Sequence, residues 1–454
     1  MKILILGAGQ VGYSIAERLA LPENHITIVD NDEQKLARIE ERLDIRTILG
    51  HAAHPHVLEM AEAQNADMLI AVTNVDEVNI VACEVVHSLF DLKIKIARIR
   101  DQSFLNERRK PILFQEENIS IDYVISPEVE IAKTISKGIK AGGLSHIVDV
   151  FEEVKLINLK CEERSPILNT PIRLLLSIFP TINVVIVAIQ RKEKIFIPNA
   201  DDVIQLGDNV SVIMLERQLN EVIAIFGYSE PAPKNVIIAG GGNIGQVLAQ
   251  EIEANLPDVA LKIIDLDPIR LDNISRFLKR TEFLVGDICD IDILEEIWVG
   301  ECDTFVSVTN NDRVNILAVL LAKYLGVPRV TTLLSNQKFA PFAESLGINS
   351  IVDPNAITVS TVLRYTKPKK ISSLFSIAGK VDVLEVEVDG TSNVIGLITT
   401  EDMKIPGQVF IAAIKRGGEL FLFPENMAVL AEDKLVIVAT AESVYKVERI
   451  IMSK

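Results

Sequence analysis

Long apolar runs, basic charge and paired cysteines are all scarce in this sequence, and each absence excludes a class of protein. No run reaches the roughly 18 uninterrupted apolar residues of a membrane-spanning helix, and the longest, such as residues 181–189, have the length of a strand. Lysine and arginine number 46 against 63 aspartate and glutamate, which gives a net charge of −17. Binding to nucleic acid or to anionic lipid needs a basic face, so both are disfavoured.

Cysteine pairs and catalytic signatures are missing as well. The four cysteines (Cys83, Cys161, Cys289 and Cys302) are far apart and include no CxxC pair, so we expect buried, reduced thiols in an intracellular protein. The first residues lead directly into a glycine-rich motif and are not expected to form a cleaved signal. No GxSxG, HExxH or Gly-Lys-Ser/Thr phosphate loop is present, which argues against the common hydrolases and P-loop ATPases.

The sequence does contain a long internal repeat. The glycine-rich stretch at residues 5–16 returns at 238–249, and four further pairs of segments match: 26–36 with 261–271, 47–59 with 283–295, 69–82 with 305–318, and 122–132 with 349–359. Each repeated unit alternates short apolar strands with amphipathic helices, which is typical of a parallel sheet covered on both faces. A strand-rich segment with a predicted hairpin follows each unit, at residues 184–198 and 409–424.

The repeat predicts a tandem duplication of the α/β class, with two Rossmann-like parallel-sheet domains that are each followed by a small α+β domain. The predicted units are N1 at residues 1–139, C1 at 145–228, N2 at 234–366 and C2 at 372–454. Glycine, proline and charged residues at 140–145, 228–235 and 366–373 predict linkers between them. The basic residues 367–370 are expected to be part of the last linker rather than a binding site.

Gly7, Gly9 and Gly12 form a GxGxxG turn between an apolar strand and a helix, the setting in which Rossmann folds bind a dinucleotide. Glycine lets the backbone approach a pyrophosphate, and the free N–H groups of the helix attract its charge. Asp30 ends the second strand, where an acid accepts ribose hydroxyls and repels a 2′-phosphate, so NAD is favoured over NADP. The candidate cofactor-binding residues are Gly7, Ala8, Gly9, Gln10, Val11, Gly12 and Asp30.

The second half repeats this arrangement, with the acid again at the end of the second strand of its unit. Glycines that served only the close packing of helix and strand would not explain an acid in both halves, so nucleotide binding is the preferred interpretation. The candidate residues here are Gly240, Gly241, Gly242, Asn243, Ile244, Gly245 and Asp265.

Thr73 and Asn74 are further candidates, because they lie at the end of the fourth predicted strand, the edge at which open sheets bind ligands. Their polar groups could contact ribose or phosphate. Alternatively, Asn74 or Asp76 could cap the helix that follows, and the two roles are compatible.

Arginines at the end of the fifth strand distinguish the two halves. Period-two alternation places Arg98 and Arg100 on one side of that strand, and Arg98 is the candidate to clamp a phosphate. Leu333 and Ser335 stand at the matching places in the second half. We therefore expect unequal sites, the second binding more weakly or preferring another nucleotide.

Three histidines within six residues (His51, His54 and His56) raise the question of a zinc site. No cysteine or acid of suitable spacing lies nearby, and the second half has Gly286 and Asp287 in this region with no histidine. No metal site is expected, because a local cluster rarely closes a tetrahedral coordination shell.

A helix with a narrow apolar stripe ends each N unit. Ser126 and Pro127 are expected to start the first, which carries Ile131, Ile135 and Ile139 on one stripe, and Asp353-Pro354 starts the second. Such a helix could pack on the neighbouring unit and transmit hinge movement, or it could pack within its own unit. The sequence leaves both alternatives open.

Two nucleotide sites without an acid–base residue in either C unit favour sensing over catalysis. The chain is therefore not expected to be an enzyme. One alternative is an NAD-dependent oxidoreductase with an unrecognised substrate site, and another is a ligand-binding scaffold that serves a different transporter or channel.

The motifs "ILGAGQVG", "AVTNVDEVN", "ARIR" and "ISPE", their partial second copies, and "IFIPNADDVIQLGDNVSVI" in C1 resemble the RCK (regulator of K⁺ conductance) family over nearly the whole chain. The resemblance implies a cytoplasmic regulatory subunit, peripheral at the inner face of the cell membrane, that forms a homo-oligomeric (tetrameric) ring. The implied partner is an integral-membrane potassium transporter of the Trk type. The implied ligands are NAD(H) and, as in relatives, ATP or ADP, held in the first site by Gly7 to Gly12, Asp30, Thr73, Asn74 and Arg98 and in the second by Gly240 to Gly245 and Asp265.

Overall fold

The computed structural model describes most of the chain. The described residues are all those of 1–454 except 21–23, 106–108, 116–117, 141–146, 152, 193, 228–232, 298, 349, 367–370, 378, 400–404, 406–407, 445, 448–450 and 452–454. Most of the three predicted linkers, including the basic residues 367–370, lies outside the described residues.

Six parallel strands form the first sheet, in the order β3-β2-β1-β4-β5-β6. The chain starts at β1, moves outward to β3 and then returns to place β4 on the other side of β1, so the strand order reverses between β1 and β4. In doubly wound sheets, ligands bind beyond the carboxyl ends of the strands at this reversal. The strands are β1 (Lys2–Leu6), β2 (His25–Asp30), β3 (Arg46–Leu49), β4 (Met68–Ala71), β5 (Ile94–Arg98) and β6 (Tyr123–Ile125). The helices are α1 (Gln10–Leu19), α2 (Glu33–Glu40), α3 (Pro55–Met60), α4 (Asp76–Phe90), α5 (Gln102–Leu105), α6 (Lys110–Leu113) and α7 (Pro127–Lys140).

The second sheet repeats this topology, in the order β14-β13-β12-β15-β16-β17, as the internal repeat predicts. Strand β15 is buried at all four positions, because helices cover both faces of a doubly wound sheet. The strands are β12 (Asn235–Ala239), β13 (Ala260–Asp265), β14 (Glu282–Val285), β15 (Thr304–Ser307), β16 (Arg329–Leu333) and β17 (Ser350–Val352). The helices are α10 (Asn243–Asn255), α11 (Pro268–Ser275), α12 (Ile291–Glu296), α13 (Asp312–Tyr324), α14 (Ala340–Ser345) and α15 (Pro354–Thr366).

Two smaller antiparallel sheets follow the parallel ones, in the orders β10-β9-β11-β8-β7 and β18-β19-β22-β20-β21. The strands of the first are β7 (Ile147–Phe151), β8 (Val154–Lys160), β9 (Val184–Arg191), β10 (Lys194–Phe196) and β11 (Asn209–Leu215), with helices α8 (Leu175–Ile178) and α9 (Leu219–Ile225). The strands of the second are β18 (Ile371–Ile377), β19 (Val381–Glu387), β20 (Val409–Arg416), β21 (Glu419–Leu422) and β22 (Lys434–Thr440).

The two small units pack on each other through one apolar core, to which Val187, Ile213, Val383 and Val438 all contribute. Both predicted hairpins are confirmed, as β9 with β10 and β20 with β21. The predicted last helix, at residues 442–451, lies partly outside the described residues.

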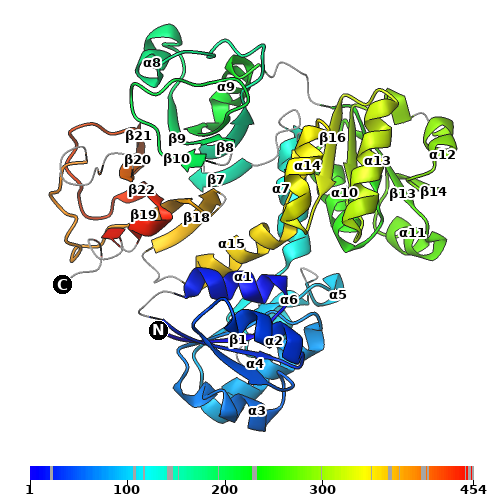
Figure 1. Cartoon of the computed structure of the whole chain (residues 1–454), viewed down its shortest axis with the longest axis vertical. Coiled ribbons are helices and arrows are strands. Elements are labelled where there is room, and N and C mark those ends of the chain that lie inside the picture. The colour runs from blue at the N-terminus through cyan, green and yellow to red at the C-terminus, as the bar shows by residue number, and fades with distance from the viewer. Residues whose placement is uncertain are drawn as a thin grey trace.

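Helices α7 and α15 are exchanged between the two halves (Figure 1). The apolar stripe of α7 (Ile131, Ile135 and Ile139) is buried in the core of the second parallel-sheet unit, and α15 packs on α1 of the first through Val359 and Val362. Packing of each helix within its own unit is therefore wrong. Burial of the three isoleucines alone contributes up to about 1.5–3 kcal/mol each, so the exchange holds the halves together firmly.

The cysteines are free, as expected, and Cys83, Cys161 and Cys302 are buried while Cys289 is half-buried. Burial raises the pKa of the Cys302 thiol to about 12, which keeps it protonated and inert at neutral pH. Across the described part of the chain, no helix combines the length and apolar character needed to cross a membrane.

Candidate nucleotide-binding sites

The glycine-rich turn of the first half leads from β1 into α1, and each of its three glycines has a different role. Gly7 has a φ of +107°, and a Cβ there would lie 3.1 Å from the backbone of Thr73. A Cβ on Gly12 would lie 1.8 Å from the carbonyl oxygen of Gly7. A Cβ on Gly9 would meet no atom within 4 Å. Packing therefore requires Gly7 and Gly12, whereas Gly9 keeps space open above the start of α1.

The turn of the second half has the same geometry. Gly240 has a φ of +110°, and a Cβ on Gly245 would lie 1.9 Å from the Gly240 oxygen, while the space above Gly242 is open. Gly9 and Gly242 are the N-caps of α1 and α10, so no side chain caps either helix and neither carries an acid in its first turn. Unsatisfied N–H groups and the helix dipole at such an end favour an anion. We name the region around Gly7–Gly12 site one and that around Gly240–Gly245 site two.

The residues between these glycines serve the turn in different ways. The N–H groups of Ala8 and Gly241 donate to Asp30 and Asp265, and Val11 is buried in the core of its unit. Ile244 packs against the cluster that contains α7, and Asn243 is exposed.

Gln10 joins the two halves at site one. Its exposed side chain accepts a 3.0 Å hydrogen bond from Nδ2 of Asn355, which lies in the first turn of α15 from the second half. Asn355 also donates to the carbonyl oxygen of Ser335. Asp353 caps α15 as the sequence predicts, accepting from the N–H groups of Asn355 and Ala356. Site one is therefore bordered by a helix of the other half.

Asp30 and Asp265 end the second strand of each sheet and hold the turns in place. Asp30 accepts from Ala8 N–H at 2.6 Å and from Asp32 N–H at 2.9 Å, and Asp265 accepts from Gly241 N–H at 2.7 Å and from Asp267 N–H at 2.9 Å. Each acid is thus a structural part of its turn. A carboxylate has about four acceptor positions, so these two bonds leave room for others.

The remaining acceptor positions are available at Asp30 but are used at Asp265. Arg270 donates to both carboxylate oxygens of Asp265 at 3.0 Å, so Asp265 accepts four hydrogen bonds. Lys35, at the matching place in site one, lies 3.8 Å from Asp30, beyond hydrogen-bond distance. A ribose hydroxyl can bond to Asp30 directly, but at Asp265 it must compete with Arg270.

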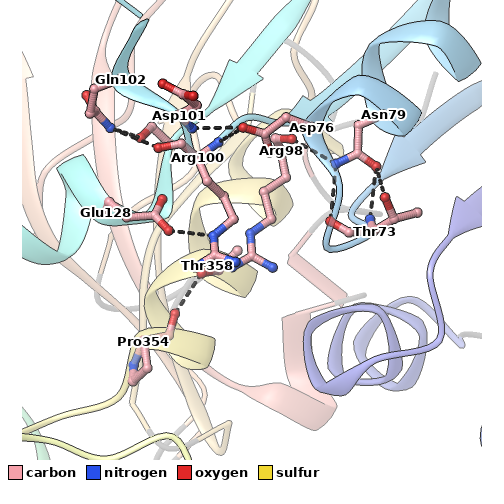
Figure 2. A network of polar contacts seen from close by, with 11 residues as sticks. Thr73, Asp76, Asn79, Arg98, Arg100, Asp101, Gln102, Glu128, Pro354 and Thr358 are labelled. Carbon is pink, nitrogen blue, oxygen red and sulfur yellow. Dashed lines mark hydrogen bonds and ion pairs between the residues drawn. The ribbon is translucent and has the colours of Figure 1, made fainter. Parts of the chain in front are cut away.

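Thr73 is held by Asn79, a residue that the sequence reasoning missed. Oδ1 of Asn79 accepts from the N–H and hydroxyl of Thr73, and Nδ2 donates to the carbonyl oxygens of Thr73 and Arg98 (Figure 2). Asn79 is fully buried on α4, so it joins the ends of β4 and β5. Asn315 makes the same bonds in the second half, to Thr309 and Leu333. The signal was available, since an asparagine recurs six residues after the threonine in both repeats.

Capping of α4 by Asn74 or Asp76 is wrong. The N-cap is Val75, which makes no side-chain cap hydrogen bond, and Asn74 is exposed. Asp76 is buried and accepts instead from the N–H groups of Arg100 and Asp101 (Figure 2), because the loop after β5 passes above the start of α4.

Arg98 and Arg100 point to one place beyond the end of β5, as the alternation predicts, although the strand itself ends at Arg98. Figure 2 shows their guanidinium groups next to each other, close to Thr358 of α15. Arg100 Nε donates to Oε1 of Glu128, in the first turn of α7, at 2.8 Å. Burial lowers the pKa of Arg98, and the charge of Arg100 lowers it further, while Glu128 and Asp76 act in the opposite direction.

Three buried polar atoms in this cluster have no hydrogen-bond partner in the described structure: Asp76 Oδ1, Arg98 Nε and Glu128 Oε2. Buried polar groups are almost always paired, so such a group of unpaired atoms needs an explanation. At the matching place in the second half stand Leu333, which is buried, Ser335 and the neutral Asn355. The two sites therefore differ in charge, and they also differ in that Asp265 is paired with an arginine whereas Asp30 is not.

The three histidines lie beside one another, with ring centroids 4.4 Å apart for His51 and His54 and 5.7 Å apart for His54 and His56. Nδ1 of His51 accepts from Ala53 N–H, just as Asp287 accepts from Cys289 N–H in the second half. His51 thus serves the loop after β3. No group of three histidine, cysteine or acidic side chains is placed to hold a metal ion within the described residues.

Comparison with known proteins identifies the family. The TrkA-N domain matches residues 3–127 and 236–354, and the TrkA-C domain matches residues 162–227. The Trk system potassium uptake protein TrkA of Azorhizobium caulinodans is 38% identical over 99% of this chain and 98% of its own length. Those of Halomonas elongata and Vibrio alginolyticus are 34% and 33% identical over 96% of this chain and 95% of their own lengths. The chain belongs to the TrkA family.

Solved structures agree with this assignment at the level of the fold. The GsuK channel bound to NAD aligns with 100% of this TrkA-family chain and 79% of its own, at a TM-score of 0.61 and 18% identity. The GsuK RCK domain aligns with 100% of this chain and 95% of its own, also at 0.61 and 18%. The duplicated RCK architecture expected from the sequence is confirmed.

The family also decides between the classes of function considered above. TrkA relatives are proteins of potassium uptake, so the expectation of a nucleotide-binding regulator of potassium transport, and not an enzyme, is confirmed over the oxidoreductase alternative.

Proposed function

We propose that this TrkA-family chain binds NAD(H), and ADP or ATP as alternatives, at site one, and that the bound nucleotide controls an integral-membrane potassium transporter of the Trk type. The observation that carries the proposal is the buried Nε of the half-buried Arg98, which has no hydrogen-bond partner in the described structure and lies at the edge where doubly wound sheets bind ligands. A phosphate oxygen would supply the acceptor that this donor lacks.

The distances fit a pyrophosphate held between the turn and this arginine. Neighbouring strands lie about 4.8 Å apart, so the end of β5 is about 10 Å from the glycine-rich turn at the end of β1, with β4 between them. A phosphate above Gly9 would accept hydrogen bonds from the N–H groups at the start of α1, and Arg98 would contact it from the opposite side. Asp30 would accept a ribose hydroxyl. Thr73 and Asn74 complete the edge between the turn and the arginine. The GsuK structures bound to NAD and to ADP support both classes of ligand.

Site two is proposed to bind the same class of ligand more weakly. Its turn, from Gly240 to Gly245, provides the same open N-terminus on α10, with Asn243 exposed beside it. Two features oppose binding: Arg270 occupies the free positions on Asp265, and Leu333 replaces the phosphate-binding arginine.

Assembly into a homo-oligomeric (tetrameric) ring is supported by matching apolar surfaces on the two halves. Val81 and Leu89 of α4 are exposed by 47% and 58%, and Leu317 and Tyr324 of α13 by 47% and 79%. Because both halves leave the same helix face uncovered, a second copy of this chain can cover both faces and continue the pattern. The ring would lie in the cytoplasm, peripheral at the inner face of the membrane, against the transporter.

Calorimetric titration of the ligand-free protein with NADH, ADP and ATP tests the proposal. Replacing Arg98 with leucine copies site two into site one and should weaken the tighter site by about 10- to 150-fold, the worth of a hydrogen bond between charged groups. Ile112→Ala serves as the control, because Ile112 lies on α6 with 62% of its surface exposed, and it should leave binding unchanged. Absence of saturable binding by all three nucleotides would refute the proposal.

The membrane partner is tested separately. Solubilised membranes that contain a Trk-type transporter should retain the protein, and a nucleotide that controls the pore should change the affinity of this capture. No retention by these membranes, with or without nucleotide, would refute the proposed partner.

A further inference from the structure

We propose that Glu128 is an internal anion that competes with the nucleotide phosphates for the arginines of site one, and that this competition transmits the occupancy of site one to helix α7. The inference rests on the proposed function of site one and adds a regulatory role for a residue that does not belong to the glycine-rich turn.

The contact itself is short and almost fully removed from solvent. Glu128 Oε1 lies 2.8 Å from Arg100 Nε, and the side chain of Glu128 is only 4% exposed, against 38% for Arg100. Its second oxygen, Oε2, has no hydrogen-bond partner in the described structure, and neither has Nε of Arg98 beside it. Three of the six such atoms among the described residues belong to this one cluster. A carboxylate in this position is held by charge but is incompletely satisfied.

A bound phosphate would change the balance of charge in this cluster. Without a nucleotide, the Arg100 guanidinium bonds to Glu128, and the charges of Glu128 and Asp76 act on the guanidinium of Arg98. With a phosphate on Arg98, Glu128 would face a second anion at short range, and like charges in a poorly solvated site repel each other strongly. The pair between Arg100 and Glu128 therefore weakens as the nucleotide binds, and by the same coupling Glu128 weakens nucleotide binding.

Helix α7 gives this competition a mechanical consequence. Glu128 lies in its first turn, whereas Ile131, Ile135 and Ile139 on the same helix are buried in the core of the second parallel-sheet unit. These isoleucines pack against α10, whose N-terminus forms site two. A change in the contact between Glu128 and Arg100 thus acts at one end of a helix whose isoleucine stripe is buried in the other half.

The matching place in the second half lacks this device. Asn355 stands where Glu128 stands, and its neutral amide bonds to Gln10 and to the Ser335 carbonyl oxygen instead of to an arginine. The competition is therefore specific to the phosphate arginines of site one.

The experiment uses the full chain and calorimetric titration with adenosine, AMP and ADP. Glu128→Gln should tighten ADP binding by about 5- to 150-fold, AMP binding by less, and adenosine binding not at all, because the competition is between negative charges. Glu130→Gln removes an equal charge two positions further along α7 and should behave like the unaltered protein. Glu128→Asp keeps the charge and should restore much of the original ADP affinity.

Two results would overturn the inference. One is an ADP affinity of Glu128→Gln equal to that of Glu130→Gln, and the other is an equal gain for adenosine, which would indicate reshaping of the site rather than relief of repulsion. If the unaltered protein binds ADP and either result appears, only the inference fails. If the unaltered protein binds none of the nucleotides, the proposed function fails with it.

A second measurement needs no substitution and so does not depend on the folding of a variant. In the unaltered protein, saturating ADP should increase hydrogen exchange at the amides of residues 131–134, whose helical acceptors lie in the first turn of α7. Unchanged or reduced exchange there on ADP binding would contradict the release of Glu128.

Discussion

Replacing Arg270 with glutamine tests why the two nucleotide sites should differ. Asp265 accepts four hydrogen bonds, and two of them, both at 3.0 Å, come from Arg270. A ribose hydroxyl must displace at least one of these. The arginine side chain is 48% exposed and the carboxylate 7% exposed, so the pair belongs near the upper end of the surface range of about 0.2–1 kcal/mol. Removing it should therefore tighten site two by about fivefold, since 1.4 kcal/mol corresponds to tenfold.

Measuring this effect requires site one to be blocked, and the structure offers a means. A Cβ on Gly9 meets no atom within 4 Å, so Gly9→Val should fill the space for a phosphate without a clash inside the protein. Titration with NADH then compares Gly9→Val alone with Gly9→Val plus Arg270→Gln. Thermal unfolding should show that both variants fold.

The matched control is Lys35→Gln in a background where Gly242→Val blocks site two. Lys35 lies 3.8 Å from Asp30 and is 40% exposed, so its removal should change site-one affinity by less than about twofold. A site-two affinity that falls or stays equal in Arg270→Gln would refute the reasoning. A fall would mean that Arg270 binds the nucleotide instead of blocking it, and an unchanged affinity would mean that Arg270 does neither.

Three further predictions concern stability. Gly12→Ala places a Cβ 1.8 Å from the Gly7 oxygen and should lower the free energy of unfolding by about 3 kcal/mol in urea denaturation. Gly9→Ala should change the free energy of unfolding by less than about 1 kcal/mol, because the space above Gly9 is open. Equal effects of the two substitutions would contradict the roles assigned to the two glycines. Asn79→Ala leaves buried backbone groups unpaired and should cost about 2–4 kcal/mol; a loss below about 1 kcal/mol would mean that water replaces the amide. Asp149 is half-exposed; burial raises its pKa, but bonds from Lys137 and Lys155 outweigh this and hold the pKa below its usual value. The contribution of Asp149 to stability is present above its unfolded pKa and is lost as pH falls through its folded pKa. Asp149→Asn should therefore lower the free energy of unfolding by up to about 1 kcal/mol at pH 7 and by nothing near pH 2. A loss of stability that persists at pH 2 would exclude the charge of Asp149 as its source.

The sequence predicts the parallel sheets and their glycine-rich turns because local chemistry determines them. Gly7 needs a positive φ and Gly12 needs the absence of a Cβ, and both requirements are visible as a spacing of glycines. The position of Asp30 and Asp265 beside the turns follows from their place at the end of the second strand of each sheet. The burial of Ile131, Ile135 and Ile139 also follows from their spacing.

Other features depend on which parts of the chain meet in space. The stripe of α7 has the same period whether it packs on its own unit or on the other, so the exchange of α7 and α15 could not be derived from it. The role proposed for Glu128 depends on the same exchange. The pairing of Arg270 with Asp265 lies within one turn of chain, but any exposed arginine at that spacing would look like a solvated side chain in the sequence.

The exchanged helices explain why differences between the halves matter for both sites. If α7 and α15 packed on their own units, each nucleotide site would respond alone. Instead, Asn355 from the second half bonds to Gln10 in the turn of site one, and α7 from the first half is buried against α10 of site two. If the sites bind nucleotides as proposed, the unpaired Nε of Arg98 at site one and the paired Asp265 at site two give a chain with one strong and one weak site that share their supporting helices. A ligand at the strong site would then act on a helix that supports the weak one, and the duplication would provide coupling within a single chain.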